Sequence, residues 1–455
     1  MNAVNTSTND LTTGTVWKRL FVFFLPIALG TIIQQLYNAV DGLVVGRFVG
    51  TSALAAVGGS AAQIINVLVG FFVAMTAGAA VVIGQIFGAG RRKDLKLAIG
   101  NAIAALSAIG ILLMIFGIVA ARIMLVALQT PMDTLDDSVL YLRIYFIGVP
   151  FIMALNMESA ILRALGDSIH PFIYMIAGCL LNIVLDITFV VVFHMGVAGV
   201  AIATVIAQVL NMVLLTIKLM GTKEDYCIGL RDLKLHGVYL SHMMRLGVPA
   251  GLQSSMYSIS NMIIQIAINT LGTTVVASWA MTSKLDGFYW AVTNAMGAAI
   301  TSFTAQNYGA GRLDRVHECV KQGMIMHLLG TIAISAVLFI SAIPLLNILT
   351  TDKDVISTTF TMMTYFVPFY FTWVPVEVLS AVLRGVGDAV KPVIIIGISV
   401  CLFRVVWIIF VFGYFHTLFI LCISYLISWV LAGTWLFIYY KKGKWDRQNK
   451  VIIDK

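Results

Sequence analysis

Long apolar stretches dominate this chain and constrain its fold more than any other feature. Each is near or above the roughly 20 residues that an α-helix needs to cross the hydrocarbon core of a bilayer. Because lipid offers no hydrogen-bond partner to a free backbone group, such segments have to be helical. The sequence therefore predicts an all-α integral membrane protein with twelve transmembrane helices, at 17–46, 53–87, 94–121, 134–164, 170–194, 197–220, 240–270, 275–308, 315–343, 355–385, 390–413 and 415–440.

The composition excludes an ordinary soluble protein and indicates an orientation in the membrane. Hydrophobic residues make up 60% of the chain and charged residues only 11%, against about 25% in a soluble domain. Most of the 29 Lys and Arg residues stand at the two ends or in connections after even-numbered helices. The positive-inside rule therefore predicts that both termini are cytoplasmic in the plasma (inner) membrane. Since the charge of +8 reflects topology, we expect the lipid bilayer and no nucleic acid as a partner.

The two halves of the chain repeat each other. Residues 159–171 (S-A-I-L-R-A-L-G-D-S-I-H-P) and 380–392 (S-A-V-L-R-G-V-G-D-A-V-K-P) are identical at seven of thirteen positions, at an offset of 221. The same offset relates Q-I-F-G-A-G-R at 85–91 to Q-N-Y-G-A-G-R at 306–312. A period this long indicates a duplicated half-protein rather than a solenoid repeat. Duplicated membrane halves usually enclose a transport pathway with a binding site between them.

The repeat sets the predicted domain organisation. Each half carries six helices, an even number, so both halves enter the membrane in the same direction and form two pseudo-symmetric lobes. We predict an amino-terminal lobe at 1–220, a cytoplasmic linker at 221–239 and a carboxy-terminal lobe at 240–455. The repeated glycine motifs are predicted as interior turns, in which Gly ends one helix and Pro lies near the start of the next. We expect the repeated arginines to pair with the aspartates that follow them, Arg163 with Asp167 and Arg384 with Asp388.

A polar cluster is predicted in the outer half of the amino-terminal lobe. Asp186 lies sixteen residues, or roughly 24 Å, into a helix rising from the cytoplasm. Thr204 lies seven residues, about 10 Å, into the next helix, which descends from the outer surface. Asp41 stands late in the first ascending helix, at a comparable depth. Asn182 and Tyr37 each precede one of these acids by four residues and therefore share its helix face.

These residues are predicted to bind the coupling ion. Carboxylates are costly inside a membrane and are functional candidates by default. Two carboxylates, an amide and a hydroxyl at Asp41, Asn182, Asp186 and Thr204 suit Na⁺, a small hard cation. They equally suit a proton, because two close carboxylates in an apolar site repel each other unless one is protonated. The alternative is a structural hydrogen-bond network that joins three helices.

The repeat shows that this cluster is not duplicated. A local offset of 223 takes Asp41 to Ile264, and the offset of 221 takes Asp186 to Trp407. Duplication alone would have placed acids in both halves. The polar site is therefore expected to be specialised in the amino-terminal lobe.

Further polar residues within the spans are candidate substrate contacts. Glu158 and Glu377 lie near the inner ends of helices, where they suit a cationic substrate or a nearby base. Lys284 and Asp286 are two residues apart and do not face each other on one helix, so Arg404 is a possible partner for the acid. The full candidate set is Tyr37, Asn156, Glu158, Gln265, Asp286 and Glu377.

No catalytic motif accompanies these residues. The chain has no G-x-x-x-x-G-K-[ST] and no H-E-x-x-H, so neither nucleotide hydrolysis nor zinc proteolysis is encoded. Its five cysteines lack the paired spacing of a disulfide framework or a zinc site. We therefore expect a protein that is not an enzyme and needs no cofactor apart from a coupling ion.

The motifs resemble those of one transporter family. Twelve spans in two halves, Q-x-x-G-A-G-R after helices 2 and 8, and L-R-x-x-G-D after helices 4 and 10 are similar to the MATE (multidrug and toxic compound extrusion) family. Residues 34–50 (Q-Q-L-Y-N-A-V-D-G-L-V-V-G-R-F-V-G) resemble its prokaryotic members. The resemblance implies a monomeric secondary antiporter that exports cationic amphipathic drugs or toxic compounds in exchange for inward H⁺ or Na⁺. It also implies a cation site similar to the cluster named above.

A flippase for lipid-linked oligosaccharides or peptidoglycan precursors is the alternative function, because such proteins resemble this family in their helices. A flippase is expected to carry a strongly basic cavity that binds pyrophosphate. Acids outnumber bases within the predicted spans of this chain, which favours a cationic substrate.

Overall fold

The chain folds into two compact helical units. The computed structural model describes residues 10–224, 226–443 and 445, and this part of the chain contains no strand. The first unit comprises Asp10 and Leu25–Gly251. The second comprises Leu11–Phe24 and the described residues from Leu252 on. The units therefore divide inside the first helix, beside Pro26, and inside α8, beside Pro249.

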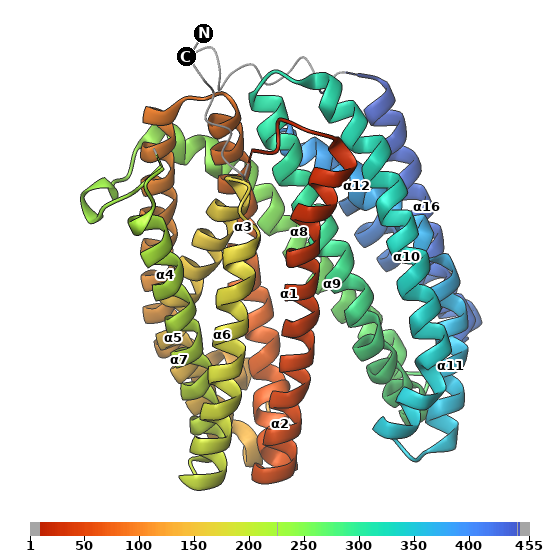
Figure 1. Cartoon of the computed structure of the whole chain (residues 1–455). Coiled ribbons are helices and arrows are strands. Elements are labelled where there is room, and N and C mark those ends of the chain that lie inside the picture. Colours follow the sequence, from red (N-terminus) through yellow and green to blue (C-terminus); the bar gives the residue numbers. More distant parts are fainter. Residues whose placement is uncertain (1–9, 225, 444, 446–455) are drawn as a thin grey trace. The chain divides into compact units, whose positions relative to one another are not determined.

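The first unit is built around α5, which packs against α3, α4 and α7. Figure 1 shows α4, α5, α6 and α7 running side by side. Glycines allow the close approach, since a Cβ on Gly117 of α4 would lie 2.2 Å from the ring of Phe146 on α5. Its complete helices are α2 (Thr51–Gly58), α3 (Ser60–Gly88), α4 (Arg92–Ala127), α5 (Met132–Ala164), α6 (Ile169–Asp186) and α7 (Gly196–Gly221). It also contains α1 (Val16–Val44) from Leu25 on and α8 (Gly237–Asn269) up to Gly251.

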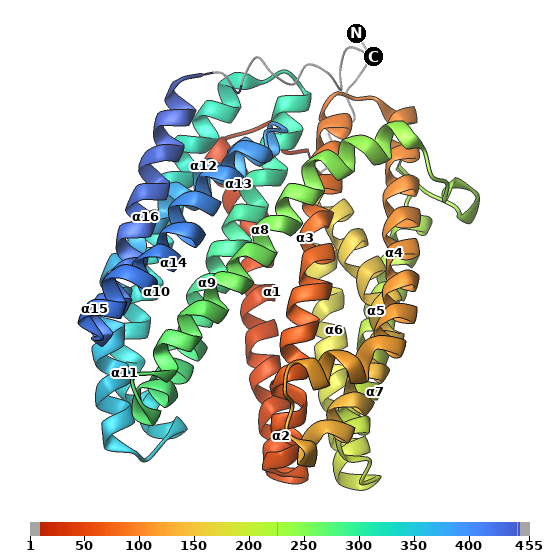
Figure 2. The same ribbon diagram turned by 180° about the vertical axis from the view of Figure 1, so that it is seen from behind.

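The second unit is built around α9, which packs against α10, α11 and α12, while α12 also packs against α16 (Figure 2). Its helices are α9 (Thr273–Gly309), α10 (Leu313–Leu349), α11 (Lys353–Phe366), α12 (Val374–Gly385), α13 (Val390–Ile396), α14 (Phe403–Trp407), α15 (Gly413–Phe415) and α16 (Leu418–Lys441). The span predicted at 355–385 is not one regular helix. A 3-10 segment at Val367–Trp373 separates α11 from α12, because Pro368 and Pro375 cannot donate backbone hydrogen bonds.

The fold class predicted from the sequence is confirmed as an all-α, multi-pass membrane protein. Ten helices in the described residues are long and apolar enough to cross a bilayer. The predicted count of twelve adds α8 and α9, which are 33 and 37 residues long but more polar. At 1.5 Å per residue each exceeds the ~30 Å hydrocarbon core.

The repeated glycine motifs form the predicted turns. Gly90 and Gly311 have φ of +71° and +70°, and Gly166 and Gly387 have +88° and +93°. In each turn the amide after the glycine donates to the carbonyl five residues earlier, at 2.8–3.2 Å. This is the left-handed helix end that favours glycine, so both halves keep the same turn for the same backbone reason.

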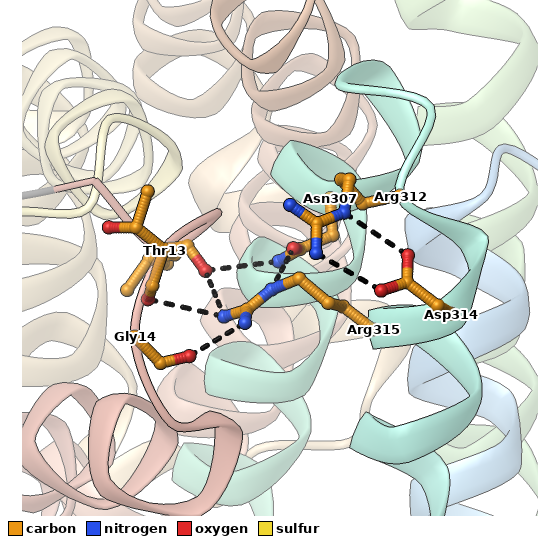
Figure 3. Close-up of polar contacts among 7 residues, drawn as sticks. Thr13, Gly14, Asn307, Arg312, Asp314 and Arg315 are labelled. Atoms are coloured by element: carbon orange, nitrogen blue, oxygen red, sulfur yellow. Dashed lines mark hydrogen bonds and ion pairs between the residues drawn. The ribbon is translucent and has the colours of Figure 1, made fainter. Parts of the chain in front are cut away.

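The residues just before α1, from Leu11 to Gly14, form a strap that is held by contacts within the second unit. The amide of Leu11 donates to Oε1 of Gln306 at 3.1 Å. The guanidinium of Arg315, near the start of α10, donates to the carbonyl of Gly14 at 2.6 Å, as Figure 3 shows. It also donates to the carbonyl of Leu11 at 3.0 Å. The strap is therefore fixed to the residues around the second G-A-G-R turn.

A corresponding strap precedes α8 and is held within the first unit. Oδ1 of Asn101 accepts from the amide of His236, just before α8, at 2.7 Å. Oδ1 of Asp94 accepts from the hydroxyl of Tyr239, in the first turn of α8, at 2.7 Å. Asp94 and Arg315 are related by the offset of 221. Lys96 pairs with Asp232 at 3.1 Å, and the backbone amide of Gly229 together with Lys96 lowers the pKa of that carboxyl. Each unit thus holds the entry segment of a long proline-containing helix.

The contact between α3 and α8 inside the first unit predicts a large stability effect. A Cβ on Gly78 would lie 2.3 Å from the backbone nitrogen of Gly247, which cannot move aside without shifting a helix. We expect Gly78→Ala to lower the free energy of unfolding by about 2–3 kcal/mol. Gly330→Ala is the control, because a Cβ there meets no atom within 4 Å, and it should raise stability by ~0.5–1 kcal/mol. Thermal denaturation in detergent compares the two, and equal midpoints would contradict the packing argument.

Candidate functional site

The four residues of the predicted polar cluster lie together in the first unit. Asn182 and Asp186 stand one turn apart on α6, Asp41 near the end of α1 and Thr204 on α7. The amide nitrogen of Asn182 donates to Oδ1 of Asp41 at 3.1 Å and to Oδ2 of Asp186 at 3.0 Å. Its oxygen accepts from the backbone amide of Thr204 at 3.1 Å. This amide orientation is assigned from these partners, since it alone satisfies both ends.

The cluster is buried at its two α6 residues and half-buried at Asp41 and Thr204, and it has unused acceptor capacity. Asn182 and Asp186 are each 1% exposed, and Oδ1 of Asp186 has no hydrogen-bond partner in the described part of the chain. The carboxyl groups of Asp41 and Asp186 interact directly, and the hydroxyl of Tyr37 interacts with Asp41 and Thr204. Two adjacent carboxyl groups can hydrogen-bond only when one carries a proton. The arrangement can therefore hold a proton or, with rearrangement, a cation between the acids.

Irregular helix geometry positions both acids. Asp186 is the last residue of α6 and is followed by a π-helical segment at Ile187–Val192. Asp41 comes four residues before another π-helical segment at Val45–Val49. Such segments interrupt the regular backbone ladder and are frequent at functional sites. They place the acids where two helices leave their regular paths.

The second unit has an apolar core where the first has this cluster. Ile264, the counterpart of Asp41, is 1% exposed and belongs to a hydrophobic cluster that includes Phe412 and Leu421. Asp41 therefore belongs to a polar cluster, whereas its counterpart Ile264 is packed among apolar side chains. The counterparts of Asn182, Asp186 and Thr204 at the offset of 221 are Phe403, Trp407 and Tyr425.

A cavity of about 370 Å³ adjoins the cluster inside the first unit. Tyr37 and Asn182 belong both to its wall and to the cluster. A space of this size suits a small ligand. Sequence reasoning missed most of the polar wall, although amides inside apolar spans were a usable signal. These missed residues are Gln34, Asn66, Gln208 and Asn211.

Only two of the six candidate substrate contacts line the cavity. Tyr37 and Asn156 line the cavity. Glu158 does not, since it is 3% exposed and its Oε1 accepts from the hydroxyl of Thr216 at 2.6 Å. The other three lie in the second unit: Gln265 donates to Asn269 (2.9 Å), Asp286 accepts from the hydroxyl of Tyr370, and Glu377 pairs with Arg384 (3.4 Å).

The prediction that Arg404 pairs with Asp286 was wrong. Arg404 instead donates to Oγ of Ser428 at 3.0 Å and lies over the ring of Tyr425, 3.7 Å from its centroid. The aromatic face and the hydroxyl stabilise the guanidinium where it stands. The carboxyl of Asp286 takes its hydrogen bond from Tyr370, whose ring stacks on Tyr289 at a centroid distance of 3.9 Å.

The expected pairs between the repeated arginines and aspartates were also wrong. Asp167 accepts from the backbone amides of Ile169 (3.2 Å) and His170 (3.1 Å) and from Nδ1 of His170 (2.6 Å). Asp388 accepts from the hydroxyl of Tyr439 at 2.5 Å. Asp167 satisfies free amides at the start of the next helix, as capping residues do. Neither aspartate pairs with its expected arginine among the described residues.

The described residues contain no group of three or more His, Cys, Asp or Glu side chains that could hold a metal ion. The five cysteines are all free thiols.

Comparison with known proteins identifies the family. The MatE family model matches residues 26–188 and 249–410, once in each half of the chain. The chain belongs to the MatE family. The resemblance to MATE transporters seen in the sequence is thereby confirmed, and the two matched ranges reproduce its duplication.

Relatives and solved structures agree with this membership. The chain is 30% identical to the probable multidrug resistance protein YpnP of Bacillus subtilis over 68% of each chain. It is 25% identical to the probable multidrug resistance protein YoeA of the same organism, over 84% of this chain and 83% of the relative. A solved outward-facing MATE family transporter matches its fold with a TM-score of 0.89 at 22% identity, covering 97% of this chain and 98% of that one. At that identity the likeness concerns the fold alone.

Proposed function

We propose that this chain is a secondary antiporter that exports cationic amphipathic compounds from the cytoplasm in exchange for an inward coupling ion, H⁺ or Na⁺. Transport proceeds by alternating access of the two lobes. The carrying observation is that Tyr37 and Asn182 belong both to the acid cluster and to the cavity wall. The names of the relatives, multidrug resistance and multidrug export proteins, support the export of small molecules.

The shared side chains provide a direct route for coupling. Protonation of Asp41 or Asp186 turns one carboxylate oxygen from an acceptor into a donor, which changes the hydrogen bonds open to Asn182 and Tyr37 when the acids load. Because both also face the cavity, loading of the acids changes the surface that meets the substrate. Ion entry and substrate release are thus coupled through two hydrogen-bonding residues.

The hydrogen bonds of Asn182 favour H⁺ as the coupling ion. Its NH₂ group faces both carboxylates, and its oxygen is used by the backbone of Thr204. A Na⁺ ion needs several oxygen ligands and would be repelled by an amide nitrogen pointing at it. A proton shared by the two acids does not require the amide of Asn182 to rotate. Exchange of one proton for a monovalent cation moves no net charge, so the pH gradient drives it, and each pH unit supplies about 1.4 kcal/mol, or about tenfold accumulation.

Cavity charge does not support the flippase alternative. Arg163 is the single Lys or Arg in the wall, whereas pyrophosphate recognition calls for several bases. We further propose a monomer in the plasma (inner) membrane with both termini cytoplasmic, which rests on the distribution of Lys and Arg. The termini themselves, residues 1–9 and 446–455, lie outside the described residues.

The experiment uses proteoliposomes loaded with the cationic dye rhodamine 123. A pH gradient imposed without sodium is expected to drive dye transport, and a sodium gradient at equal pH to drive little. Transport driven only by sodium would exclude H⁺ coupling, and absence of transport under both gradients would exclude the antiporter. An uncoupler that collapses the pH gradient is the control.

A further inference from the structure

Arg163 stands in the cavity wall of the first unit without a counter-ion. It lies in the last turn of α5, next to the wall residues Ser159 and Ser168. Its side chain has no hydrogen-bond or ion-pair partner anywhere in the described residues. An unpaired guanidinium in a membrane span is costly, so this position calls for an explanation.

The second unit shows which partner Arg163 lacks. Arg384, the counterpart of Arg163, pairs with Glu377 at 3.4 Å. Two helical turns separate these residues, which places them on one face. The counterpart of Glu377 at the offset of 221 is Asn156, which also lines the cavity and donates to the carbonyl of Ile152 at 2.8 Å. The first unit therefore keeps the arginine and has replaced its carboxylate partner by a neutral amide.

The two other acids near this position do not pair with Arg163 in the described residues. Oε1 of Glu158 accepts from Thr216 at 2.6 Å, its Oε2 is buried without a partner, and Glu158 does not line the cavity. Asp167 binds His170 and the backbone amides of the following helix. Within the described chain, a ligand in the cavity is thus left to supply the anion.

We propose that Arg163 binds a carboxylate carried by the substrate, so that the cavity accepts zwitterionic amphiphiles. The planar fork of a guanidinium matches a carboxylate with two parallel hydrogen bonds. The carboxylate of the ligand takes the place that Glu377 occupies in the second unit. This proposal rests on the proposed export function and specifies the class of its substrate.

The other end of the cavity suits the cationic group of such a ligand. Tyr37 and Asn182 lie eleven residues after the wall residues Pro26 and Pro171 on their helices, about 16 Å along the axis. Arg163 thus stands near one end of the wall and the acid cluster near the other. A zwitterion can place its cation toward the acids while its carboxylate meets the guanidinium.

The test uses two dyes that differ in one group. Rhodamine 110 carries a free carboxylate, and rhodamine 123 is its methyl ester. We expect the wild-type protein in neutral detergent to bind both, as measured by fluorescence polarisation. Arg163→Gln is expected to weaken rhodamine 110 binding about 10- to 100-fold and to leave rhodamine 123 binding within about threefold.

A second variant keeps the test valid if Arg163→Gln fails to fold. Asn156→Glu recreates the ion pair of the second unit and is expected to produce the same selective loss of rhodamine 110. Arg122→Gln is the matched control, because Arg122 is exposed and pairs with Asp136 at 3.0 Å. Failure of the wild type to bind rhodamine 110, or equal weakening of both dyes by Arg163→Gln, would overturn the proposal.

Two further measurements distinguish this proposal from the binding of a lipid phosphate at Arg163 and from the antiporter proposal. In nanodiscs, phosphatidylglycerol in place of phosphatidylcholine should leave rhodamine 110 affinity unchanged. A fall in affinity that requires Arg163 would identify a lipid phosphate as the occupant and overturn the assignment to substrate. If rhodamine 123 is not exported under any gradient, the antiporter proposal fails, whereas Arg163-dependent binding of rhodamine 110 is still measurable.

Discussion

Asp41→Asn and Asp186→Asn are each expected to abolish gradient-driven export of rhodamine 123. The amide has nearly the shape of the acid but cannot take up a proton, so the shared carboxyl pair is lost. The accumulation that one coupled proton supports, about tenfold per unit of pH gradient, should fall to an equal dye concentration on both sides of the membrane. Dye accumulation in proteoliposomes with an imposed pH gradient measures the effect.

The effect of these variants should be confined to coupling. Rhodamine 123 binding in detergent should stay within about threefold, because Asp41 and Asp186 do not line the cavity. Asp133→Asn is the control, since that acid is exposed in the first turn of α5. Undiminished export by both Asn variants would remove the coupling role from this cluster.

Arg315→Met is expected to cause the largest loss of stability at the straps. Arg315 is 7% exposed and donates to the carbonyls of Thr13 and Gly14 and to Oδ1 of Asn307 (Figure 3). It also donates to the carbonyl of Leu11. Methionine fills the space but leaves these acceptors without a charged donor. We expect a loss of about 3 kcal/mol or more in the free energy of unfolding. Thermal denaturation and limited proteolysis of the segment before α1 measure it.

A neighbouring arginine supplies the control for this variant. Arg312 and Asp314, also in Figure 3, pair at 3.1 Å but are 51% and 65% exposed. Exposed pairs contribute little, so Arg312→Met should change stability by less than about 1 kcal/mol. Equal effects of the two variants, or unchanged protease sensitivity in Arg315→Met, would show that the strap is not fixed by Arg315.

Depth along the helices was enough to predict which polar residues meet. Asp41, Asn182, Asp186 and Thr204 were placed at one level by counting residues from the predicted membrane surfaces, and the structure brings them together. Regular rise per residue makes such counting reliable in membrane helices. Their role in ion coupling stays a prediction.

Pairing between charged side chains could not be predicted in the same way. Arg163 was expected to bind Asp167 because the two are close in sequence, yet Asp167 caps the next helix and Arg163 lines the cavity. Sequence proximity does not decide side-chain direction at a helix end. The straps and the cavity depend on contacts between residues up to about 300 positions apart, such as Leu11 with Arg315.

The sequence by itself determined the membrane class, the duplication, the glycine turns and the asymmetric placement of acids. These follow from local rules: apolar length, a left-handed residue at a helix end, and the fixed rise of an α-helix. Only the tertiary structure decided that Asn182 bridges the acids, that Tyr37 and Asn182 also face a cavity, and that Arg163 has no partner. Those facts depend on how neighbouring helices rotate and approach, which packing between distant segments sets.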